Sequence, residues 1–403
     1  VEEVEEVEEV EEVEEVEEAD AIVGEGVRFP VGHLRGAVVD DAEADFWPSN
    51  TALNQLNLGI VGDLGTGKTQ LLKALIAQLR WQAAEKQPTP ISILILDYKG
   101  DFLDDGFIQA VGGRILAPEG IPLSVVGLQH VDSRAERSQK KGALIDVLTK
   151  IYGGIGPVQV RNLRHALDQV WDEHGASPTL DQVTERYLQN ANNVADSVVS
   201  VLDTFVEAGV FSNEPSQLGT FAELMDDAVV VLNLHAVGQD LRLKNALVAL
   251  FLNHYYEYMG MLPQGQYQGQ NPQLRLLNSF LVVDEATNIM PYKFNALELI
   301  LRQGREFGVG VALSTQFLDD FKVGGGAGAV NYAEPLLTWF IHKVPEVDRT
   351  QLVRRGLASA TDDDAAKITQ LENHFAYYKS YGYAGRFIRG TPFFELARRS
   401  FRA

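Results

Sequence analysis

The stretch LGIVGDLGTGKTQLL at residues 58–72 constrains the fold of this chain more than any other part of it. Its apolar start, residues 58–61, predicts a short buried strand. Residues 62–69, GDLGTGKT, fit the pattern G-x-x-x-x-G-K-[ST], and residues 70–79 continue with helical spacing. The order of strand, glycine loop and helix predicts a phosphate-binding loop in an α/β domain.

The residue types in this loop suit a polyphosphate. Backbone N–H groups must turn inward around the phosphates, and Gly62, Gly65 and Gly67 permit that bend and a close approach. Lys68 supplies a positive charge to the β and γ phosphates, and Thr69 offers a hydroxyl to Mg²⁺. The alternative is a glycine-rich turn that binds nothing. We expect the phosphates of ATP to contact Gly62, Asp63, Leu64, Gly65, Thr66, Gly67, Lys68, Thr69 and Gln70.

Composition narrows the class of protein. The 403 residues are 45% hydrophobic, which is enough for one large domain or two ordinary ones. The absence of cysteine excludes disulfides, thiol catalysis and cysteine-ligated metal sites. No apolar run reaches membrane-spanning length and the N-terminus is acidic, so we expect neither a membrane segment nor a secretory signal, and a cytoplasmic location.

The formal net charge of −22 is dominated by one segment. Residues 1–18 are six copies of Val-Glu-Glu, and we interpret residues 1–19 as a low-complexity tail or artefact. They carry 12 of the 56 acidic residues, so the rest of the chain has 44 acidic against 34 basic residues, a net charge of −10. This balance argues against a broad DNA-coating surface, although a ring with a few basic groups in its pore remains compatible with it.

The chain divides by its pattern into an interrupted core. Residues 20–130 read as the first part of the core with an entry segment, residues 131–220 as an all-helical insertion, and residues 221–403 as the second part of the core. The apolar run 91–96 predicts a buried strand, and topology places the polar loop 97–102 near the phosphates; a simple polar turn is the alternative. The fold class is therefore α/β, a RecA-like P-loop NTPase core with a mostly parallel sheet.

The insertion begins with a cluster of basic residues. These side chains could face nucleic acid, but a solvated helix face is the more common arrangement, and we favour it. The residues concerned are Arg134, Arg137, Lys140 and Lys141.

A second acidic motif completes a candidate hydrolytic site. The apolar residues 280–283 end in Asp284 and Glu285. Asp284 can hold the water shell of Mg²⁺, and Glu285 can orient and deprotonate an attacking water. A kinase for a small metabolite needs no base aimed at water, so the pair favours ATP hydrolysis.

The segment after this motif offers further candidates. Gln316, at the end of the predicted strand 309–314, could bond the γ-phosphate or the lytic water. Arg302 or Arg305 could stabilise transition-state charge in the same subunit or in a neighbouring one; surface ion pairing is the equal alternative for both arginines.

Four motifs together resemble the HerA/FtsK superfamily of P-loop ATPases, which includes conjugative coupling proteins: GDLGTGKT at 62–69, DYKGD at 97–101, FLVVDEA at 280–286 and LRQGREFGVGVALSTQ at 301–316. Similar proteins are hexameric, Mg²⁺- and ATP-dependent motors that pump double-stranded DNA. The resemblance implies the roles assigned above to Lys68, Thr69, Asp284, Glu285 and Gln316. It also implies helicase-like activity in a homo-oligomer, most simply a hexamer.

The helical insertion and the phosphate loop also resemble the DptH-like ATPases of bacterial anti-phage restriction. This narrower resemblance implies an antiviral setting and a nuclease partner. The rival hypothesis is a nucleotide-gated assembly or signalling ATPase that recruits a nuclease without translocating. We expect neither the N-terminal barrel of HerA proteins nor the C-terminal winged helix of FtsK proteins.

Overall fold

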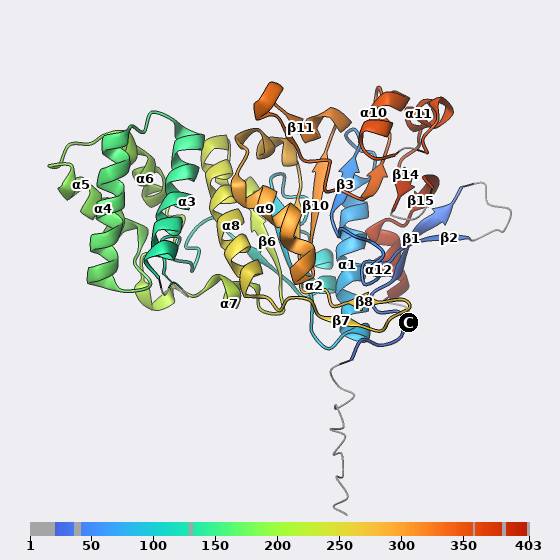
Figure 1. Ribbon diagram of the computed structural model, residues 1–403, viewed down its shortest axis with the longest axis horizontal. Coiled ribbons are helices and arrows are strands. Elements are labelled where there is room, and N and C mark those ends of the chain that lie inside the picture. The colour runs from blue at the N-terminus through green and yellow to red at the C-terminus, as the bar shows by residue number, and fades with distance from the viewer. Residues whose placement is uncertain are drawn as a thin grey trace, which may run out of the picture.

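The computed structural model describes residues 21–35, 42–128, 131, 133–357, 359–380 and 384–400. The predicted tail, residues 1–19, lies outside these ranges. Within them, one 11-stranded sheet runs through the molecule (Figure 1). Its strands, in spatial order, are β2 (Glu43–Phe46), β1 (Phe29–Leu34), β15 (Arg386–Gly390), β14 (Phe375–Lys379), β13 (Thr338–Ile341), β3 (Leu58–Val61), β10 (Val309–Thr315), β9 (Ser279–Val283), β4 (Ser92–Asp97), β6 (Val229–Asn233) and β5 (Gly113–Leu116).

Most of this sheet is parallel. From β13 through β3, β10, β9 and β4 to β6 and β5, each neighbouring pair is parallel, whereas β14, β15, β1 and β2 add an antiparallel side. The central parallel strands β3, β4, β9 and β10 are buried on both faces, as helices covering both sides of a sheet require. The predicted α/β class with a mostly parallel sheet is confirmed.

Side chains alternate between two cores along each parallel strand. In β4, Ile93 and Ile95 join a core with α1 (Lys68–Lys86), whereas Leu94 and Leu96 join a core with α8 (Leu241–Met261) and α9 (Asn295–Gln303). The alternation follows from the two-residue repeat of a strand. The sheet therefore lies between α1 on one face and α8 and α9 on the other.

Four long helices lie between β5 and β6 in the sequence and extend away from the sheet (Figure 1). Among the described residues of this stretch, none contributes a strand to the large sheet. The buried apolar cluster beneath α8 continues into these helices, so they share a core with one face of the sheet. They are α3 (Arg134–Tyr152), α4 (Pro157–His174), α5 (Leu180–Asn190) and α6 (Ser197–Glu207). The domain boundaries themselves remain a prediction.

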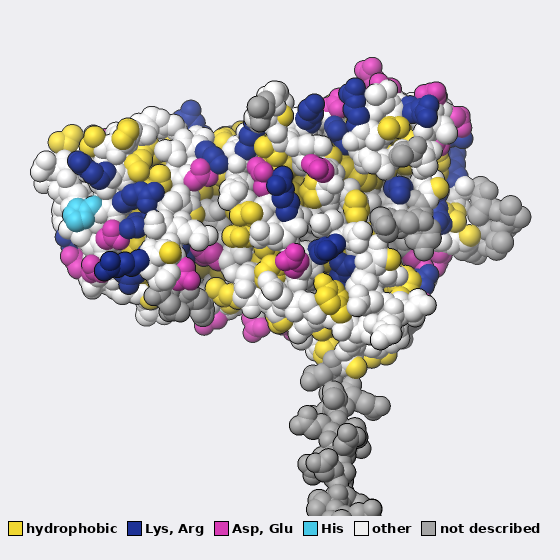
Figure 2. Space-filling view, in the orientation of Figure 1, with side chains coloured by type: hydrophobic (Ala, Val, Ile, Leu, Met, Phe, Trp, Pro, Cys, Tyr) yellow, Lys and Arg dark blue, Asp and Glu magenta, His cyan; other side chains and the backbone are white. Residues whose placement is uncertain are grey.

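The basic residues at the start of α3 face carboxylates. Lys141 Nζ lies 2.6 Å from Asp168, and Lys140 Nζ lies 3.1 Å from Glu257 on α8. Arg137 lies 3.8 Å from Asp172. Figure 2 shows Lys and Arg side chains interspersed with Asp and Glu on the face it presents. The solvated, ion-paired helix face therefore describes this cluster better than a free basic surface does.

Shorter elements complete the chain. The helices are α2 (Asp105–Val111), α7 (Phe221–Met225), α10 (Arg349–Arg354), α11 (Asp362–Ile368) and α12 (Phe393–Ser400). Two small hairpins pair β7 (Tyr267–Gln268) with β8 (Leu274–Arg275) and β11 (Lys322–Val323) with β12 (Val330–Asn331). The 3-10 turns are η2 (Pro215–Gln217), η3 (Leu234–Val237), η4 (Ala286–Asn288), η5 (Met290–Tyr292), η6 (Gly304–Phe307), η7 (Leu318–Phe321) and η8 (Gly326–Gly328). Through the described ranges, no helix combines the length and the apolar character that crossing a membrane demands.

Candidate nucleotide-binding site

The glycine loop joins the carboxyl end of β3 to the first turn of α1. Gly65 and Gly67 have φ angles of 72° and 104°, which side-chain-bearing residues rarely adopt. A Cβ on Gly67 would lie 2.6 Å from Nδ1 of His374. Gly67 caps α1 and no side chain bonds its first N–H groups, so the start of this helix can bind an anion.

Lys68 lies in the bend of the loop. It is buried, and its ammonium group donates hydrogen bonds to the carbonyl oxygen of Gly62 and, at 3.1 Å, to that of Asp63. Burial lowers the pKa of Lys68, and the charges of Glu285 and Asp284 oppose this effect. The loop thus holds a positive charge close to two carboxylates from the neighbouring strand end.

The loop after β4 is built around the buried carboxylate of Asp97. One of its oxygens accepts the backbone N–H groups of Lys99, Gly100 and Asp101 at 2.8–3.2 Å, and the other accepts that of Phe102 at 3.0 Å. Burial raises the pKa of Asp97, and these hydrogen bonds counteract the rise. Asp97 therefore fixes the loop that presents the side chains of Lys99 and Asp101.

Asp284 follows β9, between the ends of β4 and β10. Its side chain is buried, with 3% of the residue exposed. Burial, followed by the neighbouring charges of Glu285 and Asp97, raises the pKa of Asp284 to about 6. A carboxylate in such a position needs a cation beside it to remain ionised at low cost.

Glu285 has a left-handed backbone, with φ of 54°, which is uncommon for a residue other than glycine. Its Oε1 atom forms an ion pair with Nζ of Lys99, and its Oε2 atom accepts a hydrogen bond of 3.4 Å from Nε2 of Gln316. Burial alone would lower the pKa of Lys99, but the hydrogen bond and charge of Glu285 outweigh it, so that pKa is raised. Three segments far apart in sequence thus meet at one carboxylate.

Lys68, Lys99, Asp284 and Glu285 line a cavity of about 310 Å³, and Gln316 contacts it only through Glu285. Its lining contains eight of the nine residues predicted to bind phosphates, together with both acids that follow β9, and Gly62 lies directly beneath as the acceptor for Lys68. Three further residues of the lining were not predicted as site residues. The lining comprises Asp63, Leu64, Gly65, Thr66, Gly67, Lys68, Thr69, Gln70, Lys99, Asp101, Asp284, Glu285 and His374.

The side chains near Thr69 suit a magnesium ion that arrives with phosphates. Thr69 Oγ1 lies 3.4 Å from a carboxylate oxygen of Asp101, and Asp284 faces the same cavity. Within the described part of the chain, no group of three His, Asp or Glu side chains forms a metal cage. Mg²⁺ commonly binds through one or two protein oxygens plus substrate phosphates, so the donor set fits this ion.

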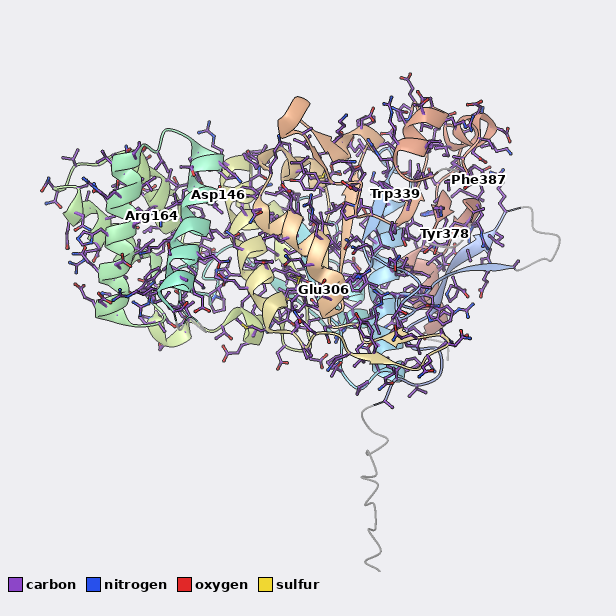
Figure 3. All side chains as sticks on the ribbon, in the orientation of Figure 1. Asp146, Arg164, Glu306, Trp339, Tyr378 and Phe387 are labelled. Atoms are coloured by element: carbon purple, nitrogen blue, oxygen red, sulfur yellow. The ribbon has the colours of Figure 1, made fainter. Side chains whose placement is uncertain are left out.

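Arg302 and Arg305 lie away from this cavity. Arg305 precedes β10 and donates a 3.1 Å hydrogen bond to the carbonyl oxygen of Asn54, and Arg302 lines a separate cavity of about 380 Å³. Gln316 follows the other end of β10, whose seven residues span about 20 Å. In Figure 3 Glu306, the neighbour of Arg305, lies below Trp339 of β13, towards the amino ends of the parallel strands. Neither arginine therefore reaches the phosphates of its own chain.

Comparisons with known proteins agree with this architecture. The family model of the type IV secretion-system coupling protein DNA-binding domain matches residues 46–119. The structure of VirB4 of Thermoanaerobacter pseudethanolicus is similar with a TM-score of 0.66 and 14% identity, over 94% of this chain and 100% of that chain.

Two structures of the plasmid coupling protein TrwB are also similar. TrwB in complex with the ATP analogue ADPNP has a TM-score of 0.50 and 15% identity, over 85% of this chain and 86% of that chain. TrwB in complex with ADP and Mg²⁺ has a TM-score of 0.50, 14% identity and the same coverage. No curated protein sequence matches the chain. These likenesses confirm the predicted fold, because the chain shares the architecture of VirB4 and of TrwB over most of its length.

Proposed function

We propose that this protein hydrolyses ATP with Mg²⁺. The observation that carries the proposal is the meeting of a phosphate-binding loop with two adjacent buried acids, Asp284 and Glu285, in one cavity. A site that only bound nucleotide would have no need of a second buried carboxylate beside the first. The ADPNP and ADP–Mg²⁺ complexes of the similarly folded TrwB support the choice of ligand.

Each residue of the site has a part in this reaction. Lys68 and the amides of the glycine loop bind and orient the β and γ phosphates. Thr69 and Asp284 would hold Mg²⁺, which neutralises phosphate charge when bound. Glu285 accepts a proton from water while the water oxygen bonds to the γ phosphorus and the bond from that phosphorus to the β-phosphate oxygen breaks. Gln316 orients Glu285 through their shared hydrogen bond.

We further propose that hydrolysis drives movement along double-stranded DNA. The matching family model, which describes a DNA-binding domain of coupling proteins, and the VirB4-like fold support this reading. Because the remaining charge of the chain is acidic, DNA contacts would be few and made by phosphate-binding groups in a ring pore, so affinity should fall with salt in proportion to that small number of contacts.

A homo-oligomer, most simply a hexameric ring, would also give Arg302 and Arg305 a role although they lie far from the phosphates of their own chain. Arg302 and Arg305 lie at the opposite end of β10 from their own site, so either arginine could stabilise transition-state charge only at the site of a neighbouring subunit. Subunits carrying Lys68→Ala should then regain ATPase activity when mixed with subunits carrying Arg305→Ala, because one mixed interface keeps both residues. No recovery in the mixture, with each variant shown to assemble, would rule out this role for Arg305.

The narrower features of the proposal follow from the resemblance rather than from the site. They are helicase-like activity, a nuclease partner and a role in anti-phage defence. A cytoplasmic location is proposed separately, because ATP and DNA are both present there. The second candidate function is a nucleotide-gated assembly ATPase that recruits a nuclease without translocating. The net acidic charge and the ion-paired basic cluster on α3 favour this candidate.

Steady-state ATP hydrolysis tests these alternatives. The wild type and Glu285→Gln would be compared with and without long duplex DNA, at low and moderate salt. If the protein is a motor, DNA should accelerate ATP hydrolysis by the wild type in a salt-sensitive manner, and Glu285→Gln should not hydrolyse ATP. Hydrolysis that depends on Glu285 but ignores DNA would support the assembly ATPase. Equal turnover by the wild type and Glu285→Gln would contradict the proposed chemistry itself.

A further inference from the structure

His374 belongs to the nucleotide cavity although it lies far from every motif in the sequence. It precedes β14, has a φ of 70°, and its backbone N–H donates a 2.9 Å hydrogen bond to the carbonyl oxygen of Thr66 in the glycine loop. Its own carbonyl oxygen accepts a 2.8 Å hydrogen bond from Gly390. Contacts on both sides therefore hold the backbone of His374 in a conformation that histidine rarely adopts.

An exposed aromatic ring stands beside this histidine. Phe394, in the first turn of α12, is 43% exposed, and its ring centroid lies 5.8 Å from that of His374 at an angle of 72°. The backbone N–H of Phe394 lies 3.4 Å from Oε1 of Gln70, which lines the cavity on α1. The neighbouring Phe393 is buried in the core, so Phe394 is the ring that this helix leaves facing outward.

We propose that His374 and Phe394 form the platform on which the base of the nucleotide stacks. The inference rests on the proposed function, because it assigns the base of the same nucleotide to the edge of the cavity, where His374 lines the cavity and Phe394 stands beside it. Phosphates bound to residues 65–69 leave the nucleoside to extend outward, and Gln70 and His374 are the next lining residues in the direction of Phe394.

The charges around the platform suit a neutral base better than a further phosphate. Burial and the positive charge of Arg389 lower the pKa of His374, which favours the uncharged form of its ring. Arg389 itself forms an ion pair of 2.6 Å with Glu395. Any base can stack on an aromatic face, because stacking needs no hydrogen bonds to the edge of the base. The platform should therefore increase nucleotide affinity with little selectivity for one base over another.

Binding measurements with two ligands separate base contacts from phosphate contacts. Calorimetry would compare Mg²⁺ complexes of ADPNP and of inorganic tripolyphosphate, which lacks a base. Since stacking on an aromatic ring stabilises a bound base, we expect Phe394→Ala to weaken ADPNP binding by about 10-fold and to leave tripolyphosphate binding unchanged. Phe394→Tyr should bind ADPNP as the wild type does.

Two more variants complete the design. His374→Asn removes the ring but keeps a residue type that tolerates a positive φ, and it should also weaken only ADPNP binding. Tyr267→Ala is the control, because it removes from β7 a ring that is 46% exposed. This variant should bind both ligands with the affinity of the wild type.

Three results would overturn the inference or the proposal beneath it. Equal weakening of both ligands by Phe394→Ala would mean that the ring supports the loop and contacts no base. If Phe394→Ala binds both ligands as the wild type does but has a different molar mass by light scattering, Phe394 is a contact between subunits and not part of a base platform. If the wild type binds neither ligand, the proposed nucleotide site itself fails, and the platform with it.

Discussion

Replacing Asp284 with asparagine should make the nucleotide-free protein more stable while removing its activity. Asp284 is buried beside Glu285, and its pKa is raised to about 6 from an ordinary 3.8. Because one pKa unit corresponds to about 1.4 kcal/mol, holding this carboxylate ionised at pH 7.5 costs the folded state about 3 kcal/mol. An amide of the same shape carries no charge and escapes that penalty.

The sign of the effect also predicts its pH dependence. The folded state binds the proton of Asp284 more tightly than the unfolded state, so protonation favours folding between pH 3.8 and about 6. This contribution is fully present below pH 3.8 and is lost as the pH rises through 6. The advantage of Asp284→Asn should therefore shrink from about 3 kcal/mol at pH 7.5 to about 1.5 kcal/mol at pH 5.

Urea denaturation of both proteins in EDTA at the two pH values measures this difference. Asp101→Asn, which removes an exposed carboxylate from the same cavity, is the matched control and should shift stability by less than about 0.5 kcal/mol. Mg²⁺-dependent ATP hydrolysis should disappear in Asp284→Asn. A variant no more stable than the wild type at pH 7.5, or an advantage that does not change with pH, would refute the reasoning.

Three other perturbations have defined outcomes. Gly67→Ala should lower the melting temperature more than Gly65→Ala does. Both positions need a positive φ, but only at Gly67 would the new Cβ lie 2.6 Å from the side chain of His374. Equal decreases in melting temperature by scanning fluorimetry would contradict this contact. Lys99→Ala removes a cation from the cavity, and we expect ATP binding to weaken about 10-fold, or about 1.4 kcal/mol, by calorimetry, whereas unaltered affinity would place Lys99 outside the phosphate site. Glu285→Gln should retain ATP binding within about threefold while turnover falls at least about 100-fold; loss of binding instead would make Glu285 a structural residue.

The parts of the site that local sequence encodes were predictable. The glycine loop must follow its strand and precede its helix, because the three are covalently continuous over residues 58–86. Asp284 and Glu285 end a buried strand, and parallel strands bring their carboxyl ends to one edge. These two facts place the loop and both acids together with no knowledge of the rest of the chain.

Contacts made only by tertiary structure were not predictable in this manner. Lys99 reaches Glu285 across 186 residues of sequence, and no spacing rule connects the two. His374 enters the cavity from an irregular turn before β14, where the pattern resembles an ordinary hairpin. A histidine with no metal-binding spacing gives no sign of such a position.

The location of the arginines could have been inferred in part. Arg305 precedes the strand that ends at Gln316, and a parallel strand carries its first and last residues to opposite edges of the sheet. The strand direction alone therefore excludes joint action of Arg305 and Gln316 on one nucleotide in one subunit. That topological signal is present in the sequence, and it favours a neighbouring subunit as the place where Arg305 could act.

The position of β3 at the centre of the sheet has a consequence for the synthesis of the chain. Both strands that flank it, β10 and β13, lie more than half the chain further along, and His374 comes later still. A ribosome therefore exposes an apolar, unpaired strand for tens of seconds before its partners emerge. A polypeptide that stops early leaves β3 with an open edge, and its glycine loop lacks the hydrogen bond from His374 to Thr66. Nascent chains that end before His374 should thus be chaperone clients rather than weakly active enzymes, and only a polypeptide that extends beyond this residue can form a complete nucleotide cavity.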